Sequence, residues 1–258
     1  MTGVGALWWR EIVRFLRQRS RVVGAFAQPL LFWILLGGGF SRSFRPPGTP
    51  SDVGALQYFY PGIIGLVLLF TAIFSTIAVV EDRKSGFLQG VLVAPISREK
   101  IVLGQALGGT TLALIQGVMF LALAPLVGIQ LSVATVALAV LVIAGVAFAL
   151  TSLGLMIAWR MESTQGFHAI MNLILMPIWL LSGAFFPASG AAGWLGWIMR
   201  LNPLTYGMAA LRRGLYLQAP AVVGPVPALV PSLLESAAKY DGRRKSSGAC
   251  QPNWTAKP

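Results

Sequence analysis

The chain has 258 residues, of which 56% are hydrophobic and only 11% are charged. A water-soluble globular protein carries about 25% charged residues, so this composition excludes a soluble globule and indicates a membrane protein. The formal net charge is +12, but the basic residues stand between long uncharged runs, which argues against a nucleic-acid partner. The one cysteine, Cys250, can form no disulfide within the chain, and no metal-binding motif surrounds it.

The first 21 residues are predicted to form a basic amphipathic helix. One face carries apolar residues and another carries arginines: Trp8, Ile12 and Phe15 against Arg10, Arg14, Arg17 and Arg21. Such a helix is expected to lie in the membrane interface, with its aromatic residues among the headgroups and its arginines on anionic lipid. No A-x-A cleavage site follows it, so the next apolar run is predicted to stay as a membrane anchor.

Five apolar stretches are long enough to cross a bilayer, which takes about 20 residues. They cover residues 22–40, 58–80, 101–127, 132–158 and 166–186. Pro29, Pro61 and Pro177 lie inside these spans and are expected to mark kinks, because neighbouring helices in a membrane can satisfy the freed carbonyl groups. Residues 219–238 are a weaker sixth candidate, since they contain four prolines and Glu235.

Lysine and arginine residues give the expected orientation. If the spans alternate and the sixth is counted, fifteen of these residues fall on the side of the N-terminus and five on the other side. By the positive-inside rule, the N-terminus and the loop over residues 81–100 are then cytoplasmic. Without the sixth span the count is ten against five, and the orientation is the same.

The loop over residues 81–100, EDRKSGFLQGVLVAPISREK, is unusually charged for this chain, because it holds three of the 8 acidic and four of the 20 basic residues. Its apolar residues recur at offsets of about one helical turn, which predicts a short amphipathic helix. These residues are Phe87, Leu88, Val91 and Leu92. Two interpretations stay open: an ordinary charged hairpin, or an element that docks on a soluble partner.

Two motifs then resemble a known family. The loop has the form E-(D)-R-K-x-G-x-L-x-x-x-L-x-x-P-I-S, and the segments LLSGAFFP and LNPLTYGMAALRRGL come later in the chain. With the order of the spans, they resemble the membrane subunit of ATP-binding cassette exporters of the type-2 permease class, which includes drug, polysaccharide and lipid exporters. The resemblance covers about residues 5–218. The chain departs from the family at Lys84 and Gln89, where acids are usual, and in its proline-rich last stretch.

The resemblance implies an all-α polytopic membrane protein. Residues 1–21 are expected to be the cytoplasmic interfacial helix, residues 22–218 the transmembrane permease domain with five helices, and residues 219–258 a degenerate sixth span and polar tail. A short cytoplasmic coupling helix is expected to dock on the ATPase subunit through Glu81, Arg83, Gly86, Leu88, Leu92 and Pro95. An outer gate is expected at Phe185, Phe186, Pro187, Asn202 and Pro203.

The expected function is that of the transmembrane subunit of an ATP-driven exporter in the plasma (inner) membrane. With a second copy of itself, it is expected to form the pathway for an amphipathic drug, lipid or glycan. No G-x-x-x-x-G-K-[ST] loop is present, so the chain is expected to be no enzyme and to hold no cofactor, with ATP and Mg on a separate ATPase subunit. The alternatives are a secondary transporter and a non-transporting membrane scaffold, of which the first usually shows ionisable groups in its spans or a repeat.

Polar and small residues within the spans are expected to be structural. Positions such as Thr111 and Gln116 are predicted to form hydrogen bonds between helices, and Gly104 and Gly108 have the GxxxG spacing that permits close helix contact. His168 is expected to be an interfacial hydrogen-bonding residue rather than a metal ligand or proton relay.

The segment between Pro187 and Pro203 is predicted to form a short amphipathic helix on the outer membrane face. Trp194, Trp197, Ile198 and Leu201 stand at helical offsets within it. Its basic residues are expected among the headgroups: Arg200, with Arg212 and Arg213 shortly after it.

Overall fold

The computed structural model of the chain describes residues 3–40, 54–93, 96–184 and 193–217. Within these ranges the regular structure is helical, with no strand. The all-α fold class predicted from the apolar runs is therefore confirmed. The sixth candidate span and the polar tail, residues 219–258, lie outside the described residues.

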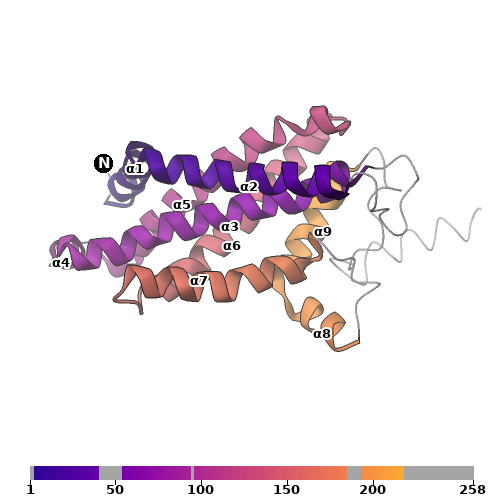
Figure 1. Ribbon diagram of the computed structural model, residues 1–258. Coiled ribbons are helices and arrows are strands. Elements are labelled where there is room, and N and C mark those ends of the chain that lie inside the picture. Colours follow the sequence, from indigo (N-terminus) through magenta and orange to yellow (C-terminus); the bar gives the residue numbers. More distant parts are fainter. Residues whose placement is uncertain (1–2, 41–53, 94–95, 185–192, 218–258) are drawn as a thin grey trace, which may run out of the picture. The chain divides into compact units, whose positions relative to one another are not determined.

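The helices form a bundle with short helices at both ends (Figure 1). Figure 1 shows α1 and α4 at one end, called the α4 end below, and α8 at the other, called the α8 end. In chain order the elements are α1 (Gly3–Arg17), α2 (Arg19–Phe40), α3 (Ala55–Lys84), α4 (Phe87–Val93), α5 (Arg98–Leu121), the 3-10 helix η1 (Ala124–Val127), α6 (Val133–Ala158), α7 (Thr164–Trp179), the π-helical turn η2 (Leu180–Ala184), α8 (Gly193–Leu201) and α9 (Pro203–Leu215).

Each predicted span corresponds to a helix. By length and composition, α3, α5, α6 and the continuous segment Thr164–Ala184 can cross a membrane. Helix α2 holds the first predicted span and has 22 residues. At 1.5 Å per residue it is about 33 Å long, enough for a hydrocarbon core of about 30 Å. The largest difference is at the end of the third span, where α5 stops at Leu121 and the chain turns through η1 to Gly128, whose φ is +78°.

Local sequence explains several helix boundaries. Ser132 and Ser163 are N-caps, and their hydroxyl oxygens accept hydrogen bonds from Thr135 N and Gly166 N at 3.1 and 3.3 Å. Pro29 and Pro61 lie inside α2 and α3 without ending them, as expected for membrane helices. After Pro177, in contrast, α7 changes into the π-helical turn η2.

Helix α3 is the centre of the bundle. It packs against α2, α5, α6 and α7, and the side chains from residue 63 to residue 73 are almost completely buried. Helix α6 buries only one stripe, which includes Ala139, Ile143 and Ala147, while Leu141 and Met156 are each 70% exposed. A helix that is apolar on its exposed side as well suits a lipid environment.

Small and polar residues bring the helices together as the sequence predicted. A Cβ atom at Gly104 would lie 2.9 Å from Leu7 Cβ, and one at Gly108 would lie 2.7 Å from Glu11 Cβ. The GxxxG pair of α5 therefore receives helix α1, and it does so in contact with backbone and Cβ atoms that cannot move alone. The Trp8 indole N–H donates to Thr111 Oγ1 at 3.0 Å across the same contact.

We expect Gly108→Val to push α1 away from α5 and to lower the free energy of unfolding by about 1–3 kcal/mol, the usual cost of overpacking a close contact. The measurement is thermal unfolding of the detergent-solubilised chain. Gly145→Val in α6 is the matched control, because nothing lies within 4 Å of a Cβ atom at that position. An equal loss in both variants would contradict the close α1–α5 contact.

Candidate functional site

Six charged side chains form a connected cluster at the α4 end, which we call the ionic junction. Helix α1 contributes three of them, α2 contributes one, and the last turns of α3 contribute two. The members are Arg10, Glu11, Arg14, Arg21, Glu81 and Asp82. The three guanidinium groups balance the three carboxylates, as expected for charges removed from water.

Asp82 lies at the centre of the ionic junction, and its side chain is only 3% exposed. Arg10 donates two hydrogen bonds to it, from Nη1 to Oδ2 at 2.7 Å and from Nη2 to Oδ1 at 2.8 Å. Arg14 Nη1 donates to Asp82 Oδ1 at 2.5 Å. Two arginines of α1 thus share one buried carboxylate of α3, and one of them holds it in the bidentate geometry that is strongest for this pair.

Glu81 extends the ionic junction to α2. Arg14 Nη2 donates to Glu81 Oε2 at 2.7 Å, and Arg21 Nη2 donates to Glu81 Oε1. Glu11 adds a contact with Arg10 Nη1 at 3.0 Å. Burial raises the pKa of the Glu11 carboxyl, although Arg10 and Arg14 act to lower it.

The prediction that the arginines of this face bind anionic lipid is wrong for Arg10, Arg14 and Arg21. Their side chains turn toward α3 because Glu81 and Asp82, in the last turns of that helix, lie within hydrogen-bonding reach. A charge-assisted hydrogen bond to a buried carboxylate is stronger than a screened contact with a hydrated headgroup. The helical wheel of residues 1–21 showed a basic face, but not the acids it meets.

Helix α4 is attached to the ionic junction. The guanidinium carbon of Arg10 lies 3.8 Å from the centroid of the Phe87 ring, a cation–π contact. Gly86, with φ +76°, makes the turn from α3 into α4 in the left-handed region that favours glycine. Leu88 is 3% exposed and anchors the helix from its apolar side, as the sequence predicted.

Arg83 links the same end of α3 to α6. Its guanidinium donates to the carbonyl oxygens of Trp159 and, at 3.3 Å, of Met161. These carbonyls follow the last turn of α6, where helices leave acceptors without a partner. A basic side chain there also suits the negative end of the helix dipole.

At the α8 end, α9 is joined to the distorted end of α7. Asn202 Oδ1 accepts a hydrogen bond from Leu204 N at 3.0 Å, and Asn202 Nδ2 donates to the Ile178 carbonyl oxygen at 2.6 Å. Pro203 is the first residue of α9, where its missing N–H costs nothing. Asn202 therefore starts one helix and ties it to another.

Arg212 reinforces this joint. It is 5% exposed, donates through Nη2 to the Gly183 carbonyl oxygen at 3.2 Å, and lies 4.6 Å from the centroid of the Tyr58 ring of α3. The prediction that Arg212 sits among headgroups is therefore wrong. The distorted turn η2, in which Gly183 has φ +82°, presents a carbonyl oxygen that a buried arginine can bind.

The part of the chain that forms this bundle matches a known protein family. The family model described as ABC-2 type transporter matches residues 2–216, which include every helix named above. The chain belongs to the ABC-2 type transporter family. The resemblance stated from the loop motif and the LSGAFFP and NPLTY motifs is thereby confirmed.

Relatives of this ABC-2 chain share its permease region. It is 29% identical over 210 residues to transport permease ycf38 of Cyanophora paradoxa, which covers 79% of this chain and 70% of that protein. It is 25% identical over 211 residues to nodulation protein J of Rhizobium meliloti (strain 1021), which covers 80% of this chain and 79% of that protein. Both similarities support a membrane-embedded transport subunit.

The coupling residues predicted for the ABC-2 chain do not form one exposed patch. Glu81 belongs to the ionic junction, Arg83 binds the end of α6, and Leu88 is buried. Leu92 lies within α4, but its side chain is outside the description, and Pro95 lies outside the described residues. The side chains with partners in this chain therefore fix α4 in position, and the predicted coupling role stays a prediction.

Of the predicted gate residues, Asn202 and Pro203 start α9 at the joint described above. Phe185, Phe186 and Pro187 lie outside the described residues. The predicted outer amphipathic helix is present as α8, and its residues Trp194, Trp197, Ile198 and Leu201 are exposed. His168 packs edge-on against the Phe74 ring at 6.2 Å between centroids, and its hydrogen-bonding role stays a prediction.

Sequence reasoning missed Asp82 as the centre of the site. The signal was available, because two adjacent acids follow the second apolar span, in the same chain as an arginine-rich amphipathic helix. Charges that end up at one membrane surface are candidates to pair. The sequence pattern does not show that Asp82 is buried when it pairs with these arginines.

We expect Asp82→Asn to leave Arg10 and Arg14 without their buried counter-charge, lowering the free energy of unfolding by about 3–5 kcal/mol. Trypsin should also cleave faster between α1 and α2, because α1 loses its attachment to α3. The measurements are thermal unfolding and limited proteolysis of the solubilised chain. Glu99→Gln is the control, since Glu99 is exposed at the same end. Equal effects in both variants would show that the ionic junction does not hold α1.

Proposed function

We propose that the chain is the transmembrane subunit of an ATP-driven exporter and that α4 docks on a separate ATPase subunit. The observation that carries this proposal is the two-sided character of α4. One side is fixed, by burial of Leu88 and by the Arg10–Phe87 contact. The other side is exposed at Gln89, Gly90 and Val93, and Val93 is 88% exposed.

The ionic junction supports a coupling role for α4. An isolated surface loop could move without moving the rest of the protein. Helix α4, in contrast, is joined to α1 through Arg10 and to α3 through a single turn at Gly86. Movement of α4 against the bundle would therefore move α3, which packs on α2, α5, α6 and α7. Rearrangement of packed helices is how a local event at one site reaches another.

The distribution of charge favours this function over a secondary transporter. The buried charged side chains within the described residues are Glu11, Asp82 and Arg212, which lie at the two ends of the bundle. A transporter driven by an ion gradient usually carries ionisable groups near the middle of the membrane. The family and the name of the transport permease relative likewise favour transport over a passive scaffold.

We place the α4 end and the N-terminus in the cytoplasm, with the chain in the plasma (inner) membrane. The excess of lysine and arginine on that side supports this orientation. ATP and Mg would then be bound by the ATPase subunit beneath α4.

A second copy of the chain would complete the pathway. The centre of the described bundle is filled by α3, whose side chains from residue 63 to residue 73 are almost fully buried. An amphipathic drug, lipid or glycan could not pass through so closely packed a core. We therefore propose that the pathway lies between two copies of the chain.

The α8 end would carry the outer gate, with Asn202 and Pro203 at the joint between α7 and α9. Phe185, Phe186 and Pro187 stay predicted members of this gate from the sequence. The exposed Trp194 and Trp197 of α8 suit the headgroup region of the outer leaflet. A short helix that rests in the interface can move with the lipid surface without unfolding the bundle.

We expect Val93→Asp to abolish stimulation of the ATPase subunit and transport, because it places a charge in the docking surface. Val133→Asp is the matched control: both valines are 88% exposed, and Val133 begins α6 at the opposite end of the bundle. The measurement is ATP hydrolysis and cargo export in reconstituted vesicles, with both variants checked for correct insertion. Normal stimulation with Val93→Asp would refute docking through α4. Charge reversal at Glu81 and Arg83 is a weaker test, since it also breaks contacts within the chain.

We expect two differently tagged copies of the chain, expressed together, to purify as one complex with two ATPase subunits. The measurement is affinity purification by one tag, detection of the other, and mass determination of the intact complex. Copies mixed only after solubilisation are the control for exchange. An active complex with a single copy of the chain would contradict the proposed pathway.

A further inference from the structure

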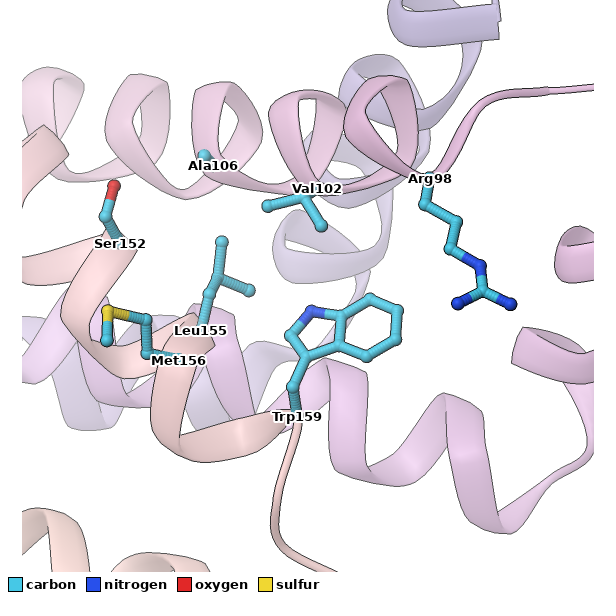
Figure 2. Close-up of a pocket in the computed structure, with 7 residues that line it drawn as sticks. All are labelled: Arg98, Val102, Ala106, Ser152, Leu155, Met156 and Trp159. Atoms are coloured by element: carbon cyan, nitrogen blue, oxygen red, sulfur yellow. The ribbon is translucent and has the colours of Figure 1, made fainter.

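A cavity of about 500 Å³ lies between α5 and α6 at the α4 end of the bundle. Its volume is within the range of about 300–1,000 Å³ that is typical of small-molecule sites. Arg98 and Trp159 stand at one end of it, Val102 and Met156 line its walls, and Ala106 and Ser152 lie at the other end, as Figure 2 shows. None of these residues belongs to the ionic junction or to α4.

The cavity carries a charge at the α4 end, from Arg98, and is mostly apolar along its walls, with Ser152 as the polar residue at the other end. Helix α5 begins at Arg98 and α6 ends at Ala158, so Arg98 and Trp159 mark the same end of two antiparallel helices. Ala106 lies eight residues further along α5, which at 1.5 Å per residue is about 12 Å deeper. The charged end and the apolar walls are thus arranged along the helix axes. The headgroup and acyl chains of a lipid in a bilayer have the same order.

Two polar groups in the cavity have no partner within the described part of the chain. The Trp159 Nε1–H is buried and forms no hydrogen bond there. Arg98 is exposed and forms no ion pair with the described residues. A buried N–H that lacks an acceptor is costly, and Figure 2 shows the indole ring lying between the apolar walls and Arg98. The indole nitrogen is closed to solvent, so Arg98 is the polar group that a ligand in the cavity can reach, and a negative charge would neutralise it.

The cavity is open to the side on which lipid would lie. Met156 is 70% exposed and Val102 is 38% exposed, and both belong to helices that can cross a membrane. A hydrocarbon chain could therefore enter between α5 and α6 from the bilayer without passing through the packed core around α3.

We infer that this cavity binds one anionic phospholipid of the leaflet at the α4 end. An acyl chain lies between Val102 and Met156 and reaches toward Ser152. The phosphate pairs with the exposed Arg98, and the lipid backbone packs beside the Trp159 indole. The inference requires that α5 and α6 span a membrane, and it is independent of the proposed export function.

The cavity also adjoins a contact between α6 and α3. Arg83 of α3 donates to the carbonyl oxygen of Trp159, so the residue that closes the cavity also fixes the last turn of α3. An occupied cavity therefore holds Trp159, and with it the helix that leads into α4.

The test uses the full chain in lipid nanodiscs that contain a photoactivatable phosphatidylglycerol with a diazirine in its acyl chain. We expect it to label peptides covering residues 98–106 and 152–159, about fivefold more than the matching phosphatidylcholine probe, as one basic contact near the surface implies. Ser152→Phe, which fills the deep end, should reduce labelling by both probes. Leu103→Phe is its control, because Leu103 is exposed on α5 and does not line the cavity.

Arg98→Gln tests the headgroup contact on an exposed residue, where a failure to fold is not expected. It should remove the preference for phosphatidylglycerol over phosphatidylcholine, while Lys100→Gln, another exposed cation of the same turn, should keep it. Equal labelling of the unaltered chain by the two probes would overturn the inference. Labelling at residues 98–106 and 152–159 that Ser152→Phe leaves unchanged would overturn it as well.

Discussion

The structure depends on the burial of one carboxylate, that of Asp82, between two arginines of another helix. A carboxylate removed from water is strongly unfavourable unless it is paired and hydrogen-bonded. Arg10 and Arg14 provide both, with distances of 2.5 to 2.8 Å. Because the buried Asp82 carboxylate would lose its counter-charges if α1 moved away, α1 is bound to α3 as a part of the bundle. The glycines at 104 and 108 are the steric side of the same contact, since they let α1 approach closely enough for the arginines to reach.

At both ends of the bundle, basic or polar side chains pair with polar groups of another helix. At the α4 end, three arginines meet three acids. At the α8 end, Arg212 and Asn202 meet backbone carbonyl oxygens near the end of α7, where Pro177 and η2 interrupt the regular hydrogen-bond pattern. In both places, a polar group that apolar surroundings would leave unsatisfied is matched by a side chain from a distant part of the sequence. Between the two ends the contacts are apolar and close, with only isolated hydrogen bonds such as that from Thr71 Oγ1 to Gln116 Oε1 at 2.5 Å.

The spans could be predicted from the sequence because a bilayer imposes a length and a composition on each helix separately. Thus α6 was expected over residues 132–158 and is Val133–Ala158. The short helix at Phe87–Val93 was also expected, from the spacing of its apolar residues. The partners of charged residues could not be predicted in this way. Whether Arg14 meets lipid or Asp82, and whether Arg212 meets headgroups or the Gly183 carbonyl, depends on how helices far apart in the sequence pack together. A helical wheel shows on which face of its helix a residue lies, but it does not show which residue of another helix that residue contacts.

Helix α3 is one continuous helix of 30 residues, about 45 Å long at 1.5 Å per residue. Near one end, Asp82 forms an ion pair with Arg10 of α1. Near the other end, the Tyr58 ring contacts the guanidinium group of Arg212 of α9. The helix is therefore a rod with a charged attachment at each end and a closely packed middle. If the middle acts as a pivot, a tilt of about 5° would carry the two ends in opposite directions by about 2 Å each, on the length given by the helical rise. A displacement of that size is comparable to a hydrogen-bond length, and the contacts of Asp82 and Tyr58 stand at the two ends that such a tilt moves most.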